Sequence, residues 1–377
     1  MPNSTDLNQT ADHAIELFNA ALAARAQGDL AAAETQCAQS LEIFQRVQGE
    51  RSPNAASVLN TLAIIRHERG NYADALTASQ QSVAILDALG AEFAGRDAVD
   101  LRTQAWGTLG NLYRHFGQYA QAEPLLQRAL DTCIAEYGEA SDEASTARND
   151  LGILYKYTGE FDRAEKLYRA ALDNIERQLG REHLATASLY HNLGGLFHAR
   201  EDFAQGEPFA RKAWEIRRKH LGDDDPATLA DAAAYAGVLD GLERYDESEP
   251  IYRDALAKFE KLYGPDSYDV AVNLNNLANI YFMRGDFAEA EALFRRALAI
   301  KEKILGADHP DTGLACNNLG VLMQSQHRDA AARELFSRAL AVFRAALGDE
   351  HPKTIMAREN LGQVKSKKVK VKSKKRQ

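Results

Sequence analysis

One spacing runs through most of the chain and limits what it can fold into. A glycine recurs every 42 residues, with one interval stretched to 47, and other residues sometimes fill its place, which we call the turn position. The turn position holds, in order, Gly28, Gly70, Gly117, Gly159, Glu201, Glu243, Gly285 and His327. Half a period later a second glycine recurs, at Gly138, Gly180, Gly222, Gly264, Gly306 and Gly348. Self-similarity at a fixed period of this size is the signature of a stacked repeat array, so we expect a solenoid.

Within each period the apolar residues follow a helical spacing. In the third period the apolar or small residues of the first run are Trp106, Leu109, Gly110 and Tyr113. Their i, i+3, i+4 and i+7 spacing places them on one face of a helix. Gly117 follows, as expected just past a helix C-terminus, and a second amphipathic run continues to the next glycine. Each period is therefore predicted to hold a helix A, a tight turn at the turn position and a longer helix B.

Three positions in each period hold only small residues. They lie seven residues before, five after and twelve after the turn position, and none holds a residue larger than serine. The first of them, which we call the small position, holds Ala21, Ala63, Gly110, Gly152, Gly194, Ala236, Ala278 and Gly320. A bulky side chain at a tight helix crossing would force the helices apart, at a cost of about 1–3 kcal/mol. We therefore expect these positions at the contacts between helices.

This pattern resembles the tetratricopeptide repeat, in which Trp-x2-Leu-Gly-x2-Tyr is followed by Ala, an aromatic residue and Ala. The matching residues of the third period are Trp106, Leu109, Gly110, Tyr113, Ala122 and Ala129, with Leu126 in the place of the aromatic residue. The 42-residue period and segments such as ILGADHPDTGLACNNLGVL look like the kinesin-light-chain subclass. The copies depart from the pattern at Ala24, Arg66 and Asp329. HEAT-like repeats have similar periods but lack the doubled small-residue signature.

The resemblance covers about residues 13–363 and implies an all-α fold, a right-handed α-α superhelical solenoid of about eight helical hairpins plus a C-terminal capping helix. The predicted repeats span about residues 13–54, 55–100, 101–142, 143–184, 185–226, 227–268, 269–310 and 311–352. Residues 353–363 repeat the start of helix A and are expected to cap the array, with Leu361 packed on the eighth repeat. Residues 1–12 and the basic segment 364–377 are predicted to be disordered.

The A helices of such repeats line a concave groove, so the resemblance directs attention to outward-facing positions of helix A. Asparagine recurs there although it is a mediocre helix former. The candidate groove asparagines are Asn111, Asn149, Asn192, Asn275, Asn276, Asn279, Asn317 and Asn318. Three of these, Asn149, Asn275 and Asn317, lie three residues before the small position. Two interpretations stay open: the amides bind the backbone of a guest peptide, as in the resembling family, or the neighbouring repeat's backbone satisfies them.

Basic side chains are frequent on the predicted A helices of the second to fifth repeats. We take Arg114 and Lys156 as candidate groove residues for this reason; the others are Arg66, Arg69, Arg148 and Arg200. One hypothesis is that the N-terminal half of the groove prefers acidic peptide segments. The alternative is a set of scattered, solvated charges.

The C-terminal end of the sequence is strongly basic, unlike the rest of the chain. Its basic side chains are Lys365, Lys367, Lys368, Lys370, Lys372, Lys374, Lys375 and Arg376, and no acid stands among them. The formal charge of the whole chain is −9, and setting these eight aside leaves −17 on the remainder. Such a tail is either a tether to nucleic acid or another anionic surface, or a solubilising disordered end.

The sequence contains none of the motifs that would suggest an enzyme or a metal protein. There is no HExxH, GxSxG or phosphate-binding glycine loop. His191 and His198 stand seven residues apart, about 10.5 Å along a helix, too far to share one zinc ion. The three cysteines lack CxxC spacing and are expected to be reduced packing residues; they are Cys37, Cys133 and Cys316. We expect no catalytic residue, no metal and no cofactor.

The same reasoning sets expectations for location and function. No apolar run reaches the roughly 18 residues of a membrane span, and residues 1–10 lack a secretory pattern, so a cytoplasmic location is expected. The favoured function is a non-enzymatic scaffold or adaptor that binds a peptide or protein segment in its concave groove. The alternative is a regulatory protein tethered to nucleic acid or an anionic surface by its basic tail.

Overall fold

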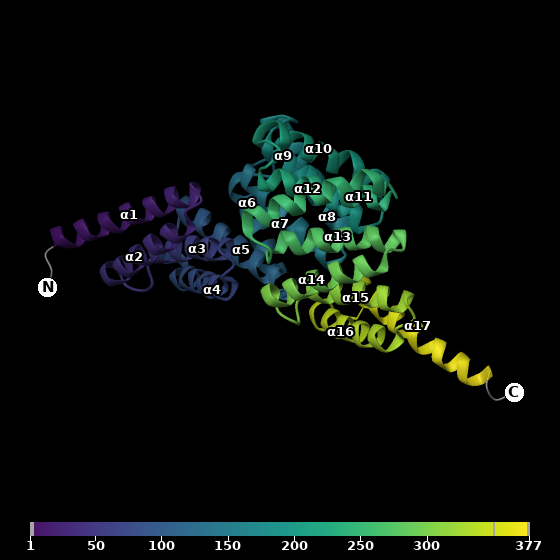
Figure 1. Ribbon diagram of the computed structural model, residues 1–377. Helices are drawn as coiled ribbons and strands as arrows, with labels where there is room; N and C mark the ends of the chain where they lie inside the picture. Colours follow the sequence, from purple (N-terminus) through teal and green to yellow (C-terminus); the bar gives the residue numbers. More distant parts are fainter. Residues whose placement is uncertain (1–3, 350, 375–377) are drawn as a thin grey trace. The chain divides into compact units, whose positions relative to one another are not determined.

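The computed structural model describes residues 4–349 and 351–374, and these residues are helical apart from short connections (Figure 1). They form α1 (Ser4–Ala26), α2 (Leu30–Gln48), α3 (Pro53–Glu68), α4 (Tyr72–Leu89), the 3-10 helix η1 (Gly90–Glu92), α5 (Arg96–His115), α6 (Tyr119–Tyr137), α7 (Asp142–Thr158), α8 (Phe161–Leu179), α9 (Leu184–Ala199), α10 (Phe203–Leu221), α11 (Pro226–Gly241), α12 (Tyr245–Tyr263), α13 (Tyr268–Arg284), α14 (Phe287–Leu305), α15 (Pro310–Ser325), α16 (Asp329–Leu347) and α17 (Pro352–Lys374). Odd-numbered helices are the predicted A helices and even-numbered ones the B helices. The predicted all-α array of consecutive helical hairpins is confirmed.

The chain divides into two compact units, unit 1 (Met1–Leu151) and unit 2 (Gly152–Gln377), and the boundary falls inside α7. In unit 1 the hairpins α1–α2, α3–α4 and α5–α6 pack in chain order, each against the next. In unit 2 the hairpins α9–α10, α11–α12, α13–α14 and α15–α16 follow the same order, and α17 packs on α16. Each hairpin thus covers the apolar face of its neighbour, as a repeat array requires.

The turn position has a left-handed backbone in every repeat, including the three where glycine is missing. The φ angle is +71° at Gly117, and +61°, +59° and +60° at Glu201, Glu243 and His327. L-residues adopt this conformation at a cost of about 1 kcal/mol, which explains why glycine dominates the position. The glycines of the second series end the B helices: the N–H of Gly138, for example, donates to the carbonyl of Ile134 at 2.9 Å.

The histidines of the loops cap the A helices. Nδ1 of His183, His309 and His351 each accepts a hydrogen bond from the backbone N–H two residues on, at 3.0–3.1 Å. These N–H groups belong to the first turn of a helix and would otherwise lack a partner inside it. Each of these histidines lies in the loop directly before its A helix or α17.

The small residues lie at the helix contacts, as predicted. All residues seven before, five after and twelve after the turn position are buried. A Cβ added to Gly110 would stand 2.7 Å from Cδ2 of Leu126, and one added to Gly194 would stand 3.0 Å from Cα of Ala210. Where serine replaces alanine its hydroxyl is used: Ser40 donates to the carbonyl of Ala14 at 2.7 Å. Close backbone approach therefore holds the hairpins together.

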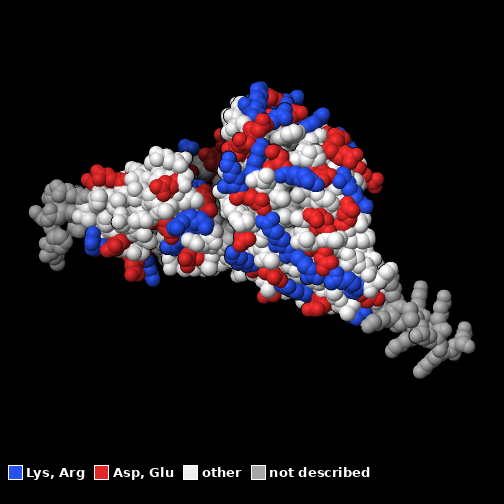
Figure 2. Space-filling view, viewed as in Figure 1, with Lys and Arg blue, Asp and Glu red and all other residues white. Residues whose placement is uncertain are grey.

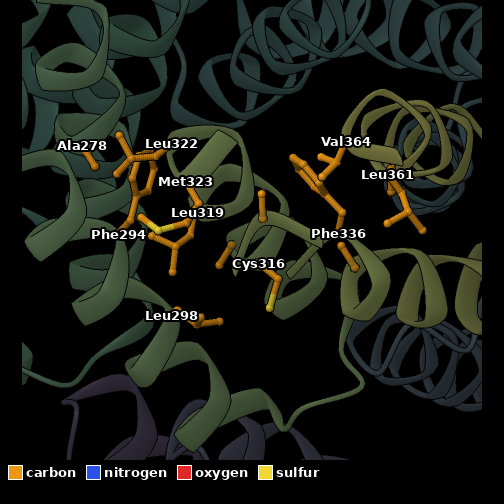
Figure 3. Packing of buried hydrophobic residues seen from close by; sticks show 14 of the residues in the cluster. Ala278, Phe294, Leu298, Cys316, Leu319, Leu322, Met323, Phe336, Leu361 and Val364 are labelled. Carbon is orange, nitrogen blue, oxygen red and sulfur yellow. The ribbon is translucent and has the colours of Figure 1, made fainter. Parts of the chain in front are cut away.

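The apolar core of the last repeats includes the start of α17. The cluster includes Phe294, Leu319 and Phe336 together with Leu361 and Val364 of α17 (Figure 3). Val364 is fully buried and Leu361 nearly so. The predicted packing of Leu361 on the eighth repeat is confirmed.

The helices extend past both predicted ends of the array. α1 begins at Ser4, within the segment 1–12, and α17 continues to Lys374, through most of the segment 364–377. Lysine is a good helix former, and extending a helix already held by packing costs little. Of the predicted tail residues, Lys375 and Arg376 lie outside the described residues.

The stretched interval between the second and third repeats has a simple structure. Its extra residues form η1 and lengthen the start of α5, which begins at Arg96. Among the described helices, none combines the length and the apolar character that a membrane crossing needs.

Candidate functional site

A cavity of about 560 Å³ lies within unit 1, between the A helices α3, α5 and α7 and above α6. Its polar lining consists chiefly of Asn60, His67, Asp100, Gln104, Asn111, Arg114, Asp142, Glu143 and Asp150. Its apolar lining consists chiefly of Ile64, Ala63, Leu112, Leu126, Ala129 and Ala147. A volume between about 300 and 1,000 Å³ with a few converging polar groups is typical of ligand sites in proteins.

Local sequence features of α5 make room for the cavity. Gly107 lies on its wall, and a Cβ added there would stand 3.7 Å from Oδ2 of Asp150, with no other atom within 4 Å. The absence of a side chain at this position therefore leaves space in front of α7. The longer start of α5 places Asp100 at the lining, where it accepts a hydrogen bond from the hydroxyl of Tyr137. The stretched interval therefore borders this cavity.

Asp150 is the most perturbed acid of the cavity. Burial raises the pKa of Asp150 to about 6, although a hydrogen bond from Asn111 and the charge of Arg114 act in the opposite direction. Burial also lowers the pKa of His67, and the nearby charge of Arg114 adds to this effect. Above pH 7 the cavity therefore holds an ionised Asp150 and a neutral His67. Perturbed acids and bases that converge in a cavity mark candidate functional sites.

Asn60 is a lining residue that the sequence reasoning missed. Its side chain is only 4% exposed, and its Oδ1 has no hydrogen-bond partner among the described residues. A buried acceptor left unpaired costs about 1–3 kcal/mol, so a ligand donor that reaches it after a small movement of the lining gains an interaction. Asn60 lies three residues before the small residue Ala63, the same place that Asn149, Asn275 and Asn317 occupy in their repeats. This shared place was the signal that could have found it.

The structure places two of the predicted groove residues in the cavity. Asn111 and Arg114 both line it, and Nε of Arg114 lies 3.4 Å from Oδ1 of Asn111. Asn149 is half-buried on α7 and is not among the cavity residues. Asn192 is buried on α9. Lys156 lies in unit 2, where its Nζ would stand 3.5 Å from a Cβ added to Gly195.

In unit 2 the predicted asparagines contact one another across repeats. Nδ2 of Asn318 donates to Oδ1 of Asn275 at 3.0 Å, and Nδ2 of Asn360 donates to Oδ1 of Asn317 at the same distance. Asn276 lies beside Asn275, with 3.5 Å between their side chains. These bonds join side chains of neighbouring repeats, whereas the sequence-based alternative expected a backbone partner. The remaining predicted residue of this group, Asn279, is half-buried on α13.

In unit 2 the end of α7 contacts the start of α17. Nε2 of His351 donates to the carbonyl of Tyr157 at 2.9 Å, because its Nδ1 accepts from the N–H of Lys353. Pro352 packs against Gly159, where an added Cβ would stand 3.2 Å from the proline ring. We call these contacts the closing contact. They join residues 194 positions apart in the chain.

Three of the six basic residues predicted for the groove form ion pairs with acids of the preceding repeat. Arg66 and Arg69 bind Glu34, and Arg200 binds Glu165 at 2.6 Å. The pattern recurs in later repeats. Figure 2 accordingly shows basic and acidic side chains interspersed over the face in view.

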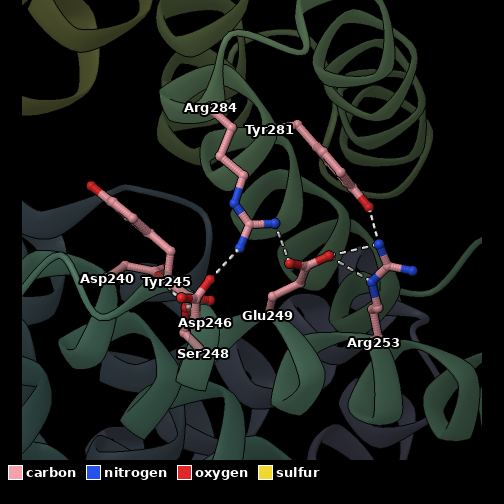
Figure 4. A network of polar contacts seen from close by, with 8 residues as sticks. All are labelled: Asp240, Tyr245, Asp246, Ser248, Glu249, Arg253, Tyr281 and Arg284. Carbon is pink, nitrogen blue, oxygen red and sulfur yellow. Dashed lines mark hydrogen bonds and ion pairs between the residues drawn. The ribbon is translucent and has the colours of Figure 1, made fainter.

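Figure 4 shows one such network between α12 and α13. Arg284 bridges Asp246 and Glu249, and Arg253 joins Glu249 to the hydroxyl of Tyr281. Among the described residues, no group of three or more His, Cys, Asp or Glu side chains is placed to hold a metal ion. His191 instead contacts the buried Asp231, with 2.6 Å between Nδ1 and Oδ1.

Comparisons with known proteins agree with this architecture. The family model described as tetratricopeptide repeat matches residues 12–88, 101–177, 157–219, 185–261, 228–303, 269–343 and 311–368. No curated protein sequence matches the chain. Among solved structures, the apo form of the quorum sensor NprR from B. thuringiensis is 13% identical, with 88% of this chain and 87% of that chain covered and a TM-score of 0.60.

Two further solved structures are similar. A Rap protein complexed with Competence and Sporulation Factor is 14% identical, with 97% of this chain and 99% of that chain covered and a TM-score of 0.57. BtubC (BKLC) from P. vanneervenii is 24% identical, with 74% of this chain and 92% of that chain covered and a TM-score of 0.44. At these identities the likeness extends to the fold alone.

Proposed function

Because the chain belongs to the tetratricopeptide repeat family, we propose that it is a non-enzymatic scaffold that holds an extended segment of a partner protein along the A helices of unit 1. Proteins of this family generally mediate protein–protein interactions. The cavity of about 560 Å³ between α3, α5 and α7 is the observation that carries the proposal. Its depth accepts a side chain of the guest, and the A-helix surface beside it accepts the guest's backbone.

The lining supplies what an extended peptide needs. Gln104 and Asn111 carry amides that both donate and accept hydrogen bonds, which suits a backbone with alternating N–H and C=O groups. The apolar surface of Ile64 and Leu126 covers a side chain that enters. A Rap protein of the same fold is known in complex with Competence and Sporulation Factor, which supports a guest molecule on this architecture.

We place the scaffold in the cytoplasm. Its three cysteines are free and buried; they are Cys37, Cys133 and Cys316. Buried thiols without a disulfide partner suit a reducing compartment.

Selection of peptides on the immobilised full-length protein tests the proposal. A displayed library of random twelve-residue peptides should yield enriched binders. Gly107→Leu fills the cavity and should remove their binding, while the matched control Gly195→Leu should leave it unchanged. Gly195 is also a half-buried helical glycine, with one long side chain, Lys156, near its added Cβ. A library that yields no binder, or binders that Gly107→Leu does not weaken, would contradict the proposal.

A further inference from the structure

The charge of the cavity lining in unit 1 points to the kind of side chain that enters it. Four carboxylates line the cavity, those of Asp100, Asp142, Glu143 and Asp150. Arg114 is the one arginine or lysine among the lining residues, and the charge of Asp150 lies close enough to interact with it. The lining is therefore anionic, which is opposite to the acidic-peptide preference suggested by the sequence. Asp142 and Glu143 are exposed, so a guest meets their negative charge on approach.

The shape of the lining selects a cation on a long apolar stem. The apolar lining includes Leu126 and Ala129 of α6 and Ile64 of α3, whereas the carboxylates belong to α5 and α7. Arginine and lysine bury their methylene stems against apolar surface and keep the charged head beside polar groups. A short polar cation or a purely apolar side chain would use only one of these two surfaces.

The unpaired acceptor distinguishes arginine from lysine. Oδ1 of Asn60 is buried on α3 and has no donor among the described residues, while Asp150 offers carboxylate oxygens from α7. A guanidinium carries five N–H donors in a planar fork, so it can serve a carboxylate and an amide oxygen together. An ammonium is a compact point charge and serves such a pair less well.

We propose that this cavity recognises an arginine side chain of the bound segment, with Asp150 and Asn60 as the groups that contact the guanidinium. The proposal rests on the scaffold function proposed above and names its specificity. The two proposals can fail separately, because a scaffold that prefers another side chain would still bind peptides.

Binding of matched peptides to the full-length protein tests the inference. The probe is a fluorescein-labelled twelve-residue peptide of alternating serine and alanine with one central arginine, and fluorescence anisotropy gives the Kd. Three companions replace the arginine by citrulline, lysine or glutamate. Citrulline keeps the shape and removes the charge. We expect at least a tenfold weaker Kd for citrulline, an intermediate Kd for lysine and no measurable binding for glutamate.

Variants then assign the preference to the cavity. Asp150→Asn should weaken the arginine peptide about tenfold and leave the citrulline peptide unchanged. Asn60→Ala should weaken the arginine peptide more than the lysine peptide. The matched control Asp269→Asn, at a half-buried carboxylate of unit 2 whose pKa burial also raises, should change neither. Thermal unfolding confirms that each variant is folded, and Asp150→Asn is expected to be at least as stable as the wild type.

The outcomes separate this inference from the scaffold function. Equal Kd values for the arginine and citrulline peptides, or tighter binding of the lysine or glutamate peptide, overturn the arginine preference. Library binders that Gly107→Leu weakens but that contain no arginine would also overturn the arginine preference. They would leave the scaffold function intact. Failure of the whole library on the wild type would instead contradict the scaffold function itself.

Discussion

The two units use the same place on helix A in opposite ways. Three residues before the small position, unit 1 has Asn60, whose amide oxygen is buried without a partner beside a cavity. In unit 2 the same place holds Asn275 and Asn317, which accept hydrogen bonds from Asn318 and Asn360 of the next repeat. At Asn275 and Asn317 an amide of the next repeat supplies the donor, whereas Oδ1 of Asn60 has no donor among the described residues.

The largest expected effect is a difference in unfolding free energy between substitutions at two glycines. One glycine permits close packing of helices, and the other borders the cavity. In unit 2, Gly194→Leu forces a side chain onto the backbone of Ala210, which has no room to move, and should cost about 3 kcal/mol of unfolding free energy. In unit 1, Gly107→Leu enters open space and also gains helix propensity, so it should change stability by less than about 1 kcal/mol. Urea unfolding compares the two. Similar losses would mean that the cavity is not open.

The closing contact of unit 2 is the next test. His351→Ala removes the hydrogen bond to Tyr157 and the cap on the N–H of Lys353, and should cost about 2 kcal/mol at pH 8. Burial lowers the pKa of His351, so the unfolded chain binds a proton more readily than the folded one. The contribution is full above the ordinary histidine pKa of about 6.5 and fades as the pH falls below it.

Urea unfolding of the wild type and of His351→Ala at pH 8 and pH 5 checks this, and the two proteins should differ less at pH 5. Hydrogen exchange should locate the loss in unit 2. A constant difference at both pH values would contradict the role of neutral His351.

Asp150→Asn should stabilise unit 1. A raised carboxyl pKa means that folding favours the protonated acid, so the ionised form destabilises the fold as the pH rises from about 4 to about 6, and fully above that. The variant should therefore gain about 1–2 kcal/mol at pH 8, and less at pH 5. Urea unfolding at both pH values measures the gain. A loss of stability at pH 8 would show that Asp150 holds the fold together and does not serve a guest.

The smallest expected effects come from the asparagines themselves. Asn318→Ala breaks the bond to Asn275 and should cost about 1 kcal/mol, because it leaves that amide oxygen without its donor. Asn60→Ala removes an acceptor that has no partner, and should be neutral or slightly stabilising. Thermal unfolding of the two single variants makes the comparison. If Asn318→Ala and Asn60→Ala lowered the stability equally, the proposed difference between the two units would be wrong.

The fold could be predicted because every repeat carries the same local sequence features. Gly117 and Gly138 end helices by backbone conformation alone, and the small residues at Gly110 and Ala122 describe a contact that lies within one hairpin. These are properties of neighbouring residues, so a sequence pattern reveals them. The repetition over eight copies then fixes the stacking order.

The cavity could not be predicted in the same way, because it depends on what several helices leave empty. Nothing in the repeat pattern marks Gly107, because its role depends on Asp150 of the next A helix. The partners of the arginines were also distant in sequence, although a regular offset of 35 residues joins Glu34 to Arg69 and Glu165 to Arg200. Such an offset is a signal that a search for ion pairs between repeats would detect.

Photo-crosslinking tests the central contrast most directly. Benzoylphenylalanine is placed at Gln104, on the cavity lining of unit 1, or at Asn279, half-buried on an A helix of unit 2, in the full-length protein. The arginine peptide is then added and the sample is irradiated. We expect a crosslinked product from position 104 and none from position 279. Crosslinking from position 279 alone, or equally from both, would contradict this expectation.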